Sequence, residues 1–521
     1  MLDLAGVGVL ARAGLLAPVR PDKLLSMGLA LARYGISPAT GYAAGAARHP
    51  RRLALVDDEG PLTYRQVDLR TDRMARELRA RGLREGDAAG LLARNGRGLV
   101  EGAVALSKVG ADVLYLGTGL AAGPLAAVLA RERARAVLHD EEFGDVVGPA
   151  LPGRIAVTTE ELGRLPAGST ASPLPVPARA SRQIILTSGT TGAPRGAARS
   201  GATVADAVAA LSRIPLRVGE TTVIAAPAFH AWGLGHVSTA MLLGSTVVLQ
   251  RRFDPERVLA AVQTHRASAL VVVPVMLEAL LGVADRYDTS SLRVVASSGS
   301  ALPGDLVQRV QARFGPVLHN LYGSTEVAYA AVATPDDLAA DPRTAGRAPY
   351  GVTLRVVDER GRDVPPGTAG RIFVGSGLAF AGYTDGSDRT RLDGLVATGD
   401  LGVLDDTGRL TVLGREDDMA VVGGENVYPG QVEDVLAEDP SVDEVAVVAD
   451  DDPAYGARLV AHVVPAAGAT IDVEHLQQRV RTTLARHAVP REVRVVDRLP
   501  RGATGKVLHR QLRERQGGEA R

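Results

Sequence analysis

Short apolar runs that end at small or polar residues recur along most of the chain. Four such runs span residues 184–189, 222–230, 269–275 and 292–303. Their length and their Gly, Pro or Ser boundaries predict buried strands, and the periodic segments between them predict crossover helices. In residues 66–82, apolar positions recur three and four apart before Gly82 ends the pattern. The chain is therefore expected to form an α/β fold with largely parallel sheets.

The pattern changes after residue 340. Short strand candidates at 354–358, 371–375 and 410–414 are separated by Gly, Pro and Asp turns, which is typical of an antiparallel or barrel-like sheet. Beyond Arg415 the pattern predicts a small α/β unit with helices over 429–437 and 472–487 and strands over 442–449 and 459–465. We expect a large N-terminal domain over residues 1–416 and a small C-terminal domain over residues 417–521.

The N-terminal segment is apolar enough to resemble a signal peptide, but its charges are in the wrong order. Asp3 precedes the apolar run and no basic residue does. Arg12 and Arg20 interrupt the run, so it cannot span a membrane. We expect an amphipathic helix that packs against the protein body. The alternative is a helix that lies on lipid and makes the protein peripheral at the membrane.

Composition narrows the classes of function. The chain has 521 residues, of which 46% are hydrophobic, so it can bury a large core. Lys plus Arg and Asp plus Glu both number 59, a balance that favours neither a nucleic-acid partner nor a membrane surface. There is no cysteine, which excludes disulfides, thiolate metal sites and a cysteine nucleophile. We expect a cytoplasmic protein, because a reducing compartment fits this composition.

The strongest local motif is TSGTTGAPRG, which follows a predicted strand at residues 187–196. Its hydroxyl groups can donate to phosphate oxygens, and its glycines let consecutive backbone N–H groups form an anion-binding nest. An ordinary flexible Gly/Thr loop would have the same composition. The motif is not a Walker A loop, because G-x-x-x-x-G-K-[ST] occurs nowhere in the chain.

Four further motifs follow in order: LYGSTEVA at 321–328, ATGDLG at 397–402, GREDDMAVVGGENVYPGQVE at 414–433 and LPRGATGKVLHRQL at 499–512. With the loop at 187–196, they resemble the acyl-adenylate-forming superfamily of AMP-binding enzymes, and most closely its bacterial fatty acyl-CoA synthetases. The resemblance runs from about residue 50 to the end of the chain. It implies a large N-terminal domain with a small barrel-like part, and a small mobile C-terminal domain.

The resemblance implies a set of nucleotide-binding residues. Those expected around the phosphates are Thr187, Ser188, Gly189, Thr190, Thr191 and Gly192. Those expected around adenine are Gly299, Ser300, Ala301, Tyr322 and Gly323, with the flat ring of Tyr322 stacked on the base. Asp400 would accept hydrogen bonds from the ribose hydroxyls, and Arg415 would contact ribose or phosphate. ATP is the implied substrate.

The resemblance also implies catalytic and metal-binding residues. Thr325 would contact the α-phosphate, and Glu326 would help to hold Mg²⁺, which prefers oxygen ligands. Lys506 would bridge the substrate carboxylate and the α-phosphate and stabilise the charge that develops there. It is one of only three lysines in the chain. His230 would lie near the carboxylate and the thiol entrance, although a histidine buried in the core is the alternative.

The hinge motif implies how the thiol would reach the acyl group. Gly423 and Gly424 would leave a narrow path for the pantetheine arm of coenzyme A, and Asp417 would be the hinge. Arg195 stands where the superfamily usually has a lysine, which keeps the charge but changes its geometry. An acyl carrier protein in trans is the alternative acceptor. The oligomeric state is open, with a homodimer as one candidate.

The expected reaction joins a carboxylic acid to coenzyme A with release of AMP and pyrophosphate. The pocket segment VAYAAVA at 327–333 is small and apolar and offers no partner for an amino group, which favours a medium- or long-chain fatty acid. A scaffold that binds nucleotide without catalysis is the alternative of another class. GVGVLA at 6–11 follows no strand, so a dinucleotide site is excluded, and no G-x-S-x-G hydrolase motif occurs.

Overall fold

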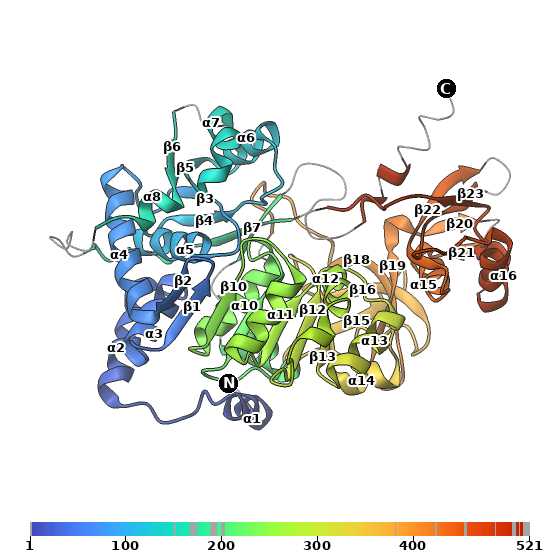
Figure 1. Ribbon diagram of the computed structural model, residues 1–521, viewed down its shortest axis with the longest axis horizontal. Coiled ribbons are helices and arrows are strands. Elements are labelled where there is room, and N and C mark those ends of the chain that lie inside the picture. Colours follow the sequence, from blue (N-terminus) through green and yellow to red (C-terminus); the bar gives the residue numbers. More distant parts are fainter. Residues whose placement is uncertain are drawn as a thin grey trace.

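A computed structural model describes residues 3–150, 153–166, 174–187, 195–199, 204–380, 382–422, 425–452, 456–484, 486–502, 507–509 and 511–513. Within these ranges the strands form four sheets, of eight, six, five and five strands. Two largely parallel sheets fill the N-terminal part, an antiparallel sheet follows, and the C-terminal sheet lies at the opposite end of the molecule (Figure 1). The fold is the α/β arrangement that the hydrophobic pattern predicts, with a large N-terminal part and a smaller C-terminal one.

The eight-stranded sheet lies at the centre of the molecule. Its order is β14 (Ala331–Ala333), β13 (Leu318–Tyr322), β12 (Val294–Ser298), β11 (Ala269–Val272), β9 (Thr221–Ile224), β10 (Thr246–Leu249), β1 (Leu53–Asp57) and β2 (Gly60–Thr63). All pairs are parallel except β13 with β14 and β1 with β2. The parallel strands end at one edge of the sheet, so the loops after β12 and β13 lie together there.

The six-stranded sheet contains β7, the strand that leads into the TSGTTGAPRG motif. Its order is β6 (Ile155–Thr158), β5 (Ala134–His139), β3 (Ala88–Leu92), β4 (Asp112–Tyr115), β7 (Gln183–Thr187) and β8 (Arg195–Arg199), with only the last pair antiparallel. The predicted strand at 184–189 is therefore present as β7. The residues between β7 and β8 lie outside the described ranges.

The antiparallel sheet predicted after residue 340 is also confirmed. β15 (Thr353–Val357), β16 (Ala369–Gly375), β18 (Leu395–Leu404), β17 (Arg391–Leu392) and β19 (Leu410–Arg415) form an antiparallel sheet. The C-terminal sheet consists of β21 (Glu425–Val427), β20 (Ala420–Val422), β23 (Gly456–Pro465), β22 (Val442–Asp452) and β24 (Glu492–Val495). A 3₁₀ turn, η3 (Glu416–Asp418), joins these two sheets. The domain boundary between residues 416 and 417 stays a prediction, and this turn is where it would fall.

Helices pack on the faces of these sheets. Those of the N-terminal part are α1 (Leu4–Arg12), α2 (Pro21–Tyr34), α3 (Pro38–Arg48), α4 (Tyr64–Ala80), α5 (Arg97–Val109), α6 (Ala122–Arg131), α7 (Gly144–Ala150), α8 (Thr159–Gly163), α9 (Val204–Arg213), α10 (Ala231–Leu242), α11 (Pro255–His265), α12 (Pro274–Leu281), α13 (Gly304–Phe314) and α14 (Pro335–Ala340). Those of the C-terminal part are α15 (Pro429–Ala437) and α16 (Val473–Thr483), and short 3₁₀ turns are η1 (Glu141–Phe143), η2 (Ala284–Arg286) and η4 (Arg486–Ala488).

Two predicted elements are shorter in the structure. The strand expected over 222–230 ends at Ile224, because the chain then turns towards Pro227, which has no backbone N–H to donate. The helix expected over 472–487 ends at Thr483. The side chain of Thr482 bonds back to the carbonyls of Gln478 and Arg479 there, a local interaction that competes with helical bonding.

The N-terminal segment packs against the body, as predicted. Val9, Leu10 and Ala13 are buried in one cluster with Val208 and Leu211 of α9. Among the described residues, no helix is long and apolar enough to cross a membrane.

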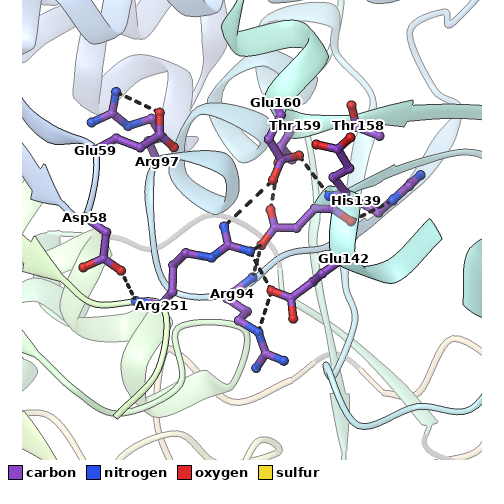
Figure 2. A network of polar contacts seen from close by, with 12 residues as sticks. Asp58, Glu59, Arg94, Arg97, His139, Glu142, Thr158, Thr159, Glu160 and Arg251 are labelled. Atoms are coloured by element: carbon purple, nitrogen blue, oxygen red, sulfur yellow. Dashed lines mark hydrogen bonds and ion pairs between the residues drawn. The ribbon is translucent and has the colours of Figure 1, made fainter. Parts of the chain in front are cut away.

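A polar network joins the two N-terminal sheets. Arg251, just after β10, forms ion pairs with Asp140 at 3.1 Å and Glu142 at 2.6 Å, both of which follow β5 (Figure 2). Asp140 is 1% exposed and also accepts hydrogen bonds from the Arg94 backbone N–H and the Thr159 hydroxyl. Because a buried carboxylate needs such partners, this network fixes one sheet against the other.

Candidate active site

One continuous cavity of about 1670 Å³ runs along the carboxyl edge of the eight-stranded sheet. It brings together ten residues that the sequence singled out: His230, Gly299, Ser300, Ala301, Tyr322, Gly323, Thr325, Glu326, Asp400 and Arg415. They come from the ends of β12 and β13, the start of α10 and the antiparallel sheet. Residues of α15 close another side of the cavity, so the C-terminal part contributes to its wall.

Tyr322, Asp400 and Arg415 form one corner of the cavity. The Tyr322 hydroxyl donates to Asp400 Oδ2 at 2.5 Å, and Arg415 lies 3.4 Å from Asp400 Oδ1. Burial, together with the Asp400 carboxylate, raises the pKa of Tyr322 well above its usual value. The phenol therefore stays a donor at neutral pH. This corner combines a flat aromatic ring with an acceptor and a cation, which suits a base and its ribose.

The loop after β12 forms the opposite wall of this corner. The predicted strand over 292–303 ends at Ser298, because Gly299 takes a φ of +102°, which side chains other than glycine rarely adopt. Ser300 and Ala301 follow and line the cavity. Small residues here leave room for a planar ring beside Tyr322.

Gly323 allows a very tight turn after β13. A Cβ at this position would overlap the carbonyl oxygen of Ala328. The turn is closed by hydrogen bonds from the Ala328 N–H to the Ser324 carbonyl and from the Ala330 N–H to the Tyr322 carbonyl. The segment that carries Thr325 and Glu326 is therefore folded back beside Tyr322.

Glu326 lies on the cavity wall with its carboxylate engaged. It is 6% exposed and accepts a hydrogen bond from the Tyr383 hydroxyl at 2.6 Å, and Arg389 lies 3.5 Å away. Burial by itself would raise the pKa of Glu326, but the Tyr383 hydrogen bond, with the charge of Arg389, holds it below the usual value. The carboxylate is thus ionised at neutral pH. Within the described residues, no cluster of three His, Cys, Asp or Glu could hold a metal by itself.

A single ionised carboxylate still fits Mg²⁺ in a nucleotide site. Mg²⁺ usually takes most of its ligands from phosphates and water and only one or two from the protein. Glu326 is the residue that would hold the metal on the cavity side. Its role stays a prediction.

His230 stands at the start of α10 and faces the cavity. It is the N-cap residue of the helix, and its ring centroid lies 4.5 Å from that of Phe229. Gly233 lets the helix start close to the preceding loop, because a Cβ there would lie 2.5 Å from the Pro227 carbonyl. His230 therefore lines the site, as the sequence predicted, although its function stays a prediction.

Several predicted residues lie outside the described part of the chain. These are Ser188, Gly189, Thr190, Thr191 and Gly192 of the phosphate loop, Gly423 and Gly424 of the thiol path, and the catalytic candidate Lys506. The side chains of Thr187 and Asp417 lie outside it as well. Arg195, the last residue but one of the loop motif, lies over the ring of Tyr383 with 5.4 Å between its guanidinium carbon and the ring centroid.

Sequence reasoning missed three residues of the cavity wall. Tyr383 and Arg389 lie in a segment without a recognised motif, and only the fold brings them to Glu326. Asn320 could have been found, because it lies two positions before Tyr322 on β13 and therefore on the same face. Within the described residues, its buried Oδ1 has no hydrogen-bond partner. Such an acceptor in the wall could receive a hydrogen bond from an amino group of a bound base.

The comparisons with known proteins agree over most of the chain. The model of the AMP-binding enzyme family matches residues 42–384, and that of the AMP-binding enzyme C-terminal domain matches residues 431–506. A feruloyl-CoA synthase from Amycolatopsis sp. is 34% identical over 478 residues, which cover 90% of this chain and 96% of that protein.

Two further comparisons bear on the acceptor and the nucleotide. The fatty acid–[acyl-carrier-protein] ligase ScoC from Streptomyces coeruleorubidus is 31% identical over 497 residues, which cover 91% of this chain and 95% of that protein. The crystal structure of ATP-bound MatB from Rhodopseudomonas palustris is 27% identical and superposes with a TM-score of 0.82 over 92% of this chain and 98% of that one.

Proposed function

Because the chain belongs to the AMP-binding enzyme family, we propose that it activates a carboxylic acid with ATP and transfers the acyl group to coenzyme A. The observation that carries the proposal is the single cavity shared by His230, Tyr322, Glu326, Asp400 and Arg415. This cavity offers a corner suited to a base, an ionised carboxylate and a wall to which α15 of the C-terminal part contributes.

The proposed reaction has two steps. A carboxylate oxygen of the acid attacks the α-phosphorus of ATP, the bond to the β-phosphate oxygen breaks, and pyrophosphate leaves. The sulfur of coenzyme A then attacks the acyl carbonyl carbon, the bond to the phosphate oxygen breaks, and AMP leaves with that electron pair. The thiol proton is lost to solvent or to a base at the site. No oxidant or reductant is needed.

The residues divide the work as follows. Tyr322 would stack on adenine, and Asp400 with Arg415 would hold the ribose. Glu326 would hold Mg²⁺, which neutralises phosphate charge when bound. Lys506 would stabilise the negative charge that grows on the carboxylate and the α-phosphate during adenylation. Gly423 and Gly424 would line the path of the thiol, and Asp417 would be the hinge between the two steps.

For the acid we propose a medium- or long-chain fatty acid. Ala328, Tyr329, Leu234 and Trp232 line the cavity together with His230, and none of them carries a carboxylate that could form an ion pair with an ammonium group. An amino acid whose ammonium group lay against these four side chains would bury a charge without an ion-pair partner, which is disfavoured. The 31% identical relative ScoC, which joins a fatty acid to a carrier protein, supports both this substrate class and a carrier protein as second candidate acceptor.

A pyrophosphate-release assay across carboxylic acids tests the proposal. Palmitate, butyrate, ferulate and free amino acids are compared with ATP and Mg²⁺, each without acceptor, with coenzyme A and with a phosphopantetheinylated acyl carrier protein. We expect release with fatty acids and thioester formation with coenzyme A. Preference for ferulate would overturn the substrate class, and thioester formation with the carrier protein alone would overturn the acceptor.

A further inference from the structure

The N-terminal helices line the end of the cavity that lies beyond His230. Residues of this wall that precede the family-matched region are the apolar Leu10, Leu15, Leu16, Leu31 and Ile36, followed by Ser37, Pro38, Thr40 and Gly41. They belong to α1, α2 and α3 and to the loops between them, and Ser238, Thr239, Met241 and Leu242 of α10 line the same cavity. Figure 1 shows α2 at the lower left, with α3 between α2 and the body, and α1 at the bottom near the middle of the view. We call this end of the cavity the distal branch.

The distal branch is built to receive an apolar group. Thr239 Oγ1 donates to the Gly235 carbonyl at 2.8 Å, and Trp232 Nε1 donates to the Val272 carbonyl at 2.9 Å. Thr40 likewise bonds its hydroxyl to the Gly35 carbonyl. The polar atoms of Thr239, Trp232 and Thr40 are thus satisfied by the backbone, so these three side chains present mainly methyl and ring carbons to a ligand.

The outer end of the branch is open to the surface. Leu31 and Ile36 line the cavity and are nevertheless 49% and 51% exposed. Leu24, Leu25 and Leu29 of α2 are also exposed. A ligand that reaches Leu31 and Ile36 would therefore emerge at the surface and would not meet a closed wall.

Gly41 and Met241 narrow the branch on its inner side. A Cβ on Gly41 would overlap the thioether of Met241, so the Met241 side chain lies against the bare backbone of α3. A side chain at position 41 would push Met241 towards the cavity that both residues line. The width of the branch at this point thus depends on a glycine.

We propose that α1, α2 and the first turn of α3 set the acyl-chain-length preference of this enzyme. The far end of a long acyl chain lies between α10 and the pair Leu31 and Ile36, and its last carbons reach the surface. This assignment rests on the proposed function, since it requires an acyl substrate whose carboxylate is near His230. It places the determinants of chain length in a segment that the family match does not include.

The test compares the ratio of kcat/KM for palmitate to that for butyrate in matched variants of the full chain. Leu31→Glu places a charge at the mouth of the branch, and we expect the ratio to fall about tenfold, the worth of burying about two methylene groups. Leu29→Glu is the control, because Leu29 is 62% exposed on the same helix and does not line the cavity. Its ratio should equal that of the wild type.

A second pair of variants tests the inner side. Gly41→Ala should lower the ratio by displacing Met241, and Gly41→Ala in a Met241→Ala background should have little further effect. An unchanged ratio in Leu31→Glu, an equal fall in Leu29→Glu, or an equal effect of Gly41→Ala in both backgrounds would overturn the inference. If the wild type activates ferulate and no fatty acid, the proposed substrate class is wrong. This outcome is seen in the wild type alone and is therefore distinguished from a failure of the chain-length assignment, which is seen only in the variants.

Discussion

The hydroxyl of Tyr322 donates a hydrogen bond to the carboxylate of Asp400, 78 residues further along the chain. Tyr322 ends a strand of the central sheet and Asp400 lies within β18 of the antiparallel sheet, so the bond links two sheets at the site. The side chain expected against adenine thereby positions the carboxylate expected against ribose.

This bond predicts a graded loss of ATP binding in two variants. Tyr322→Phe keeps the ring and removes the donor, and the KM for ATP should rise about tenfold, since a hydrogen bond to a charged group is worth about 1.5 kcal/mol. Tyr322→Ala also removes the stacking surface and should raise it further. ATP–pyrophosphate exchange measures both. Equal KM values for the two variants would contradict a stacking role for the ring.

Glu326 predicts the metal dependence of adenylation. Glu326→Gln should raise the Mg²⁺ concentration for half-maximal adenylation at least about tenfold, because a ligand charge is lost. Tyr383→Phe is a matched variant, since it leaves the carboxylate and removes only its hydrogen bond, and its effect should be smaller. The measurement is a Mg²⁺ titration of pyrophosphate release. Full activity in excess chelator would show that Glu326 holds no metal.

The proposed roles of Lys506 and Asp417 predict that adenylation and thioester formation can be slowed separately. Lys506→Ala should slow adenylation about a hundredfold, as when one donor to a developing charge is lost, and should spare thiol attack on supplied acyl-adenylate. Asp417→Pro fixes φ near about −65° and should slow only one half-reaction, because a hinge must change its backbone angles. Each half-reaction is measured alone in both variants. A Lys506→Ala enzyme that is equally slow in both steps would exclude a step-specific lysine.

Glu433 on α15 predicts a pH-dependent stability. Burial, together with the negative charges of Asp434 and Asp418, raises the pKa of Glu433 from 4.5 to about 7. Glu433 Oε1 accepts a hydrogen bond from the Val447 N–H at 2.7 Å and lies 3.9 Å from His509 Nε2. A raised pKa means that the folded state binds the proton more tightly. The stabilisation of the folded state by the protonated Glu433 carboxyl is fully present below pH 4.5 and is lost as the pH rises through about 7.

Glu433→Gln should remove this dependence, because the amide is neutral and its oxygen can still accept from Val447. We therefore expect the variant to melt at a higher temperature than the wild type above pH 7, with the difference shrinking towards pH 4.5. Glu438→Gln, at the exposed end of the same helix, is the control. Parallel melting curves for all three proteins across this pH range would show that Glu433 titrates normally.

The hydrophobic pattern predicted helices and strands well where the apolar residues of the segment itself show which side is buried. Runs such as 184–189 became β7, and residues 429–437 form α15. The ends of helices and strands were less predictable. The strand that begins near residue 222 and the helix that begins after Asp472 end where backbone or hydroxyl groups form hydrogen bonds with partners outside the regular pattern. Such partners depend on three-dimensional neighbours that periodicity does not encode.

The candidate site divides in the same way. Tyr322, Glu326 and Asp400 could be named because they stand in motifs that resemble a family. Arg389 could not, since it stands in no motif and its place in the site depends on its contacts with Tyr383 and with Glu326, 63 residues away. The place of α1 and α2 on the cavity wall was equally hidden, because amphipathicity shows that a helix packs and does not show against what.

The tight turn at Gly323 has a consequence for how substitutions combine. The same tight turn carries Tyr322 and Glu326, and its backbone hydrogen bonds tie Tyr322 to Ala330 and Ser324 to Ala328, so a shift of this backbone would move both residues. The free-energy costs of replacing the two residues are therefore expected to be non-additive, as for groups that share one backbone support. A double-mutant cycle across this turn would report the stiffness of the turn as much as the chemistry of the two side chains.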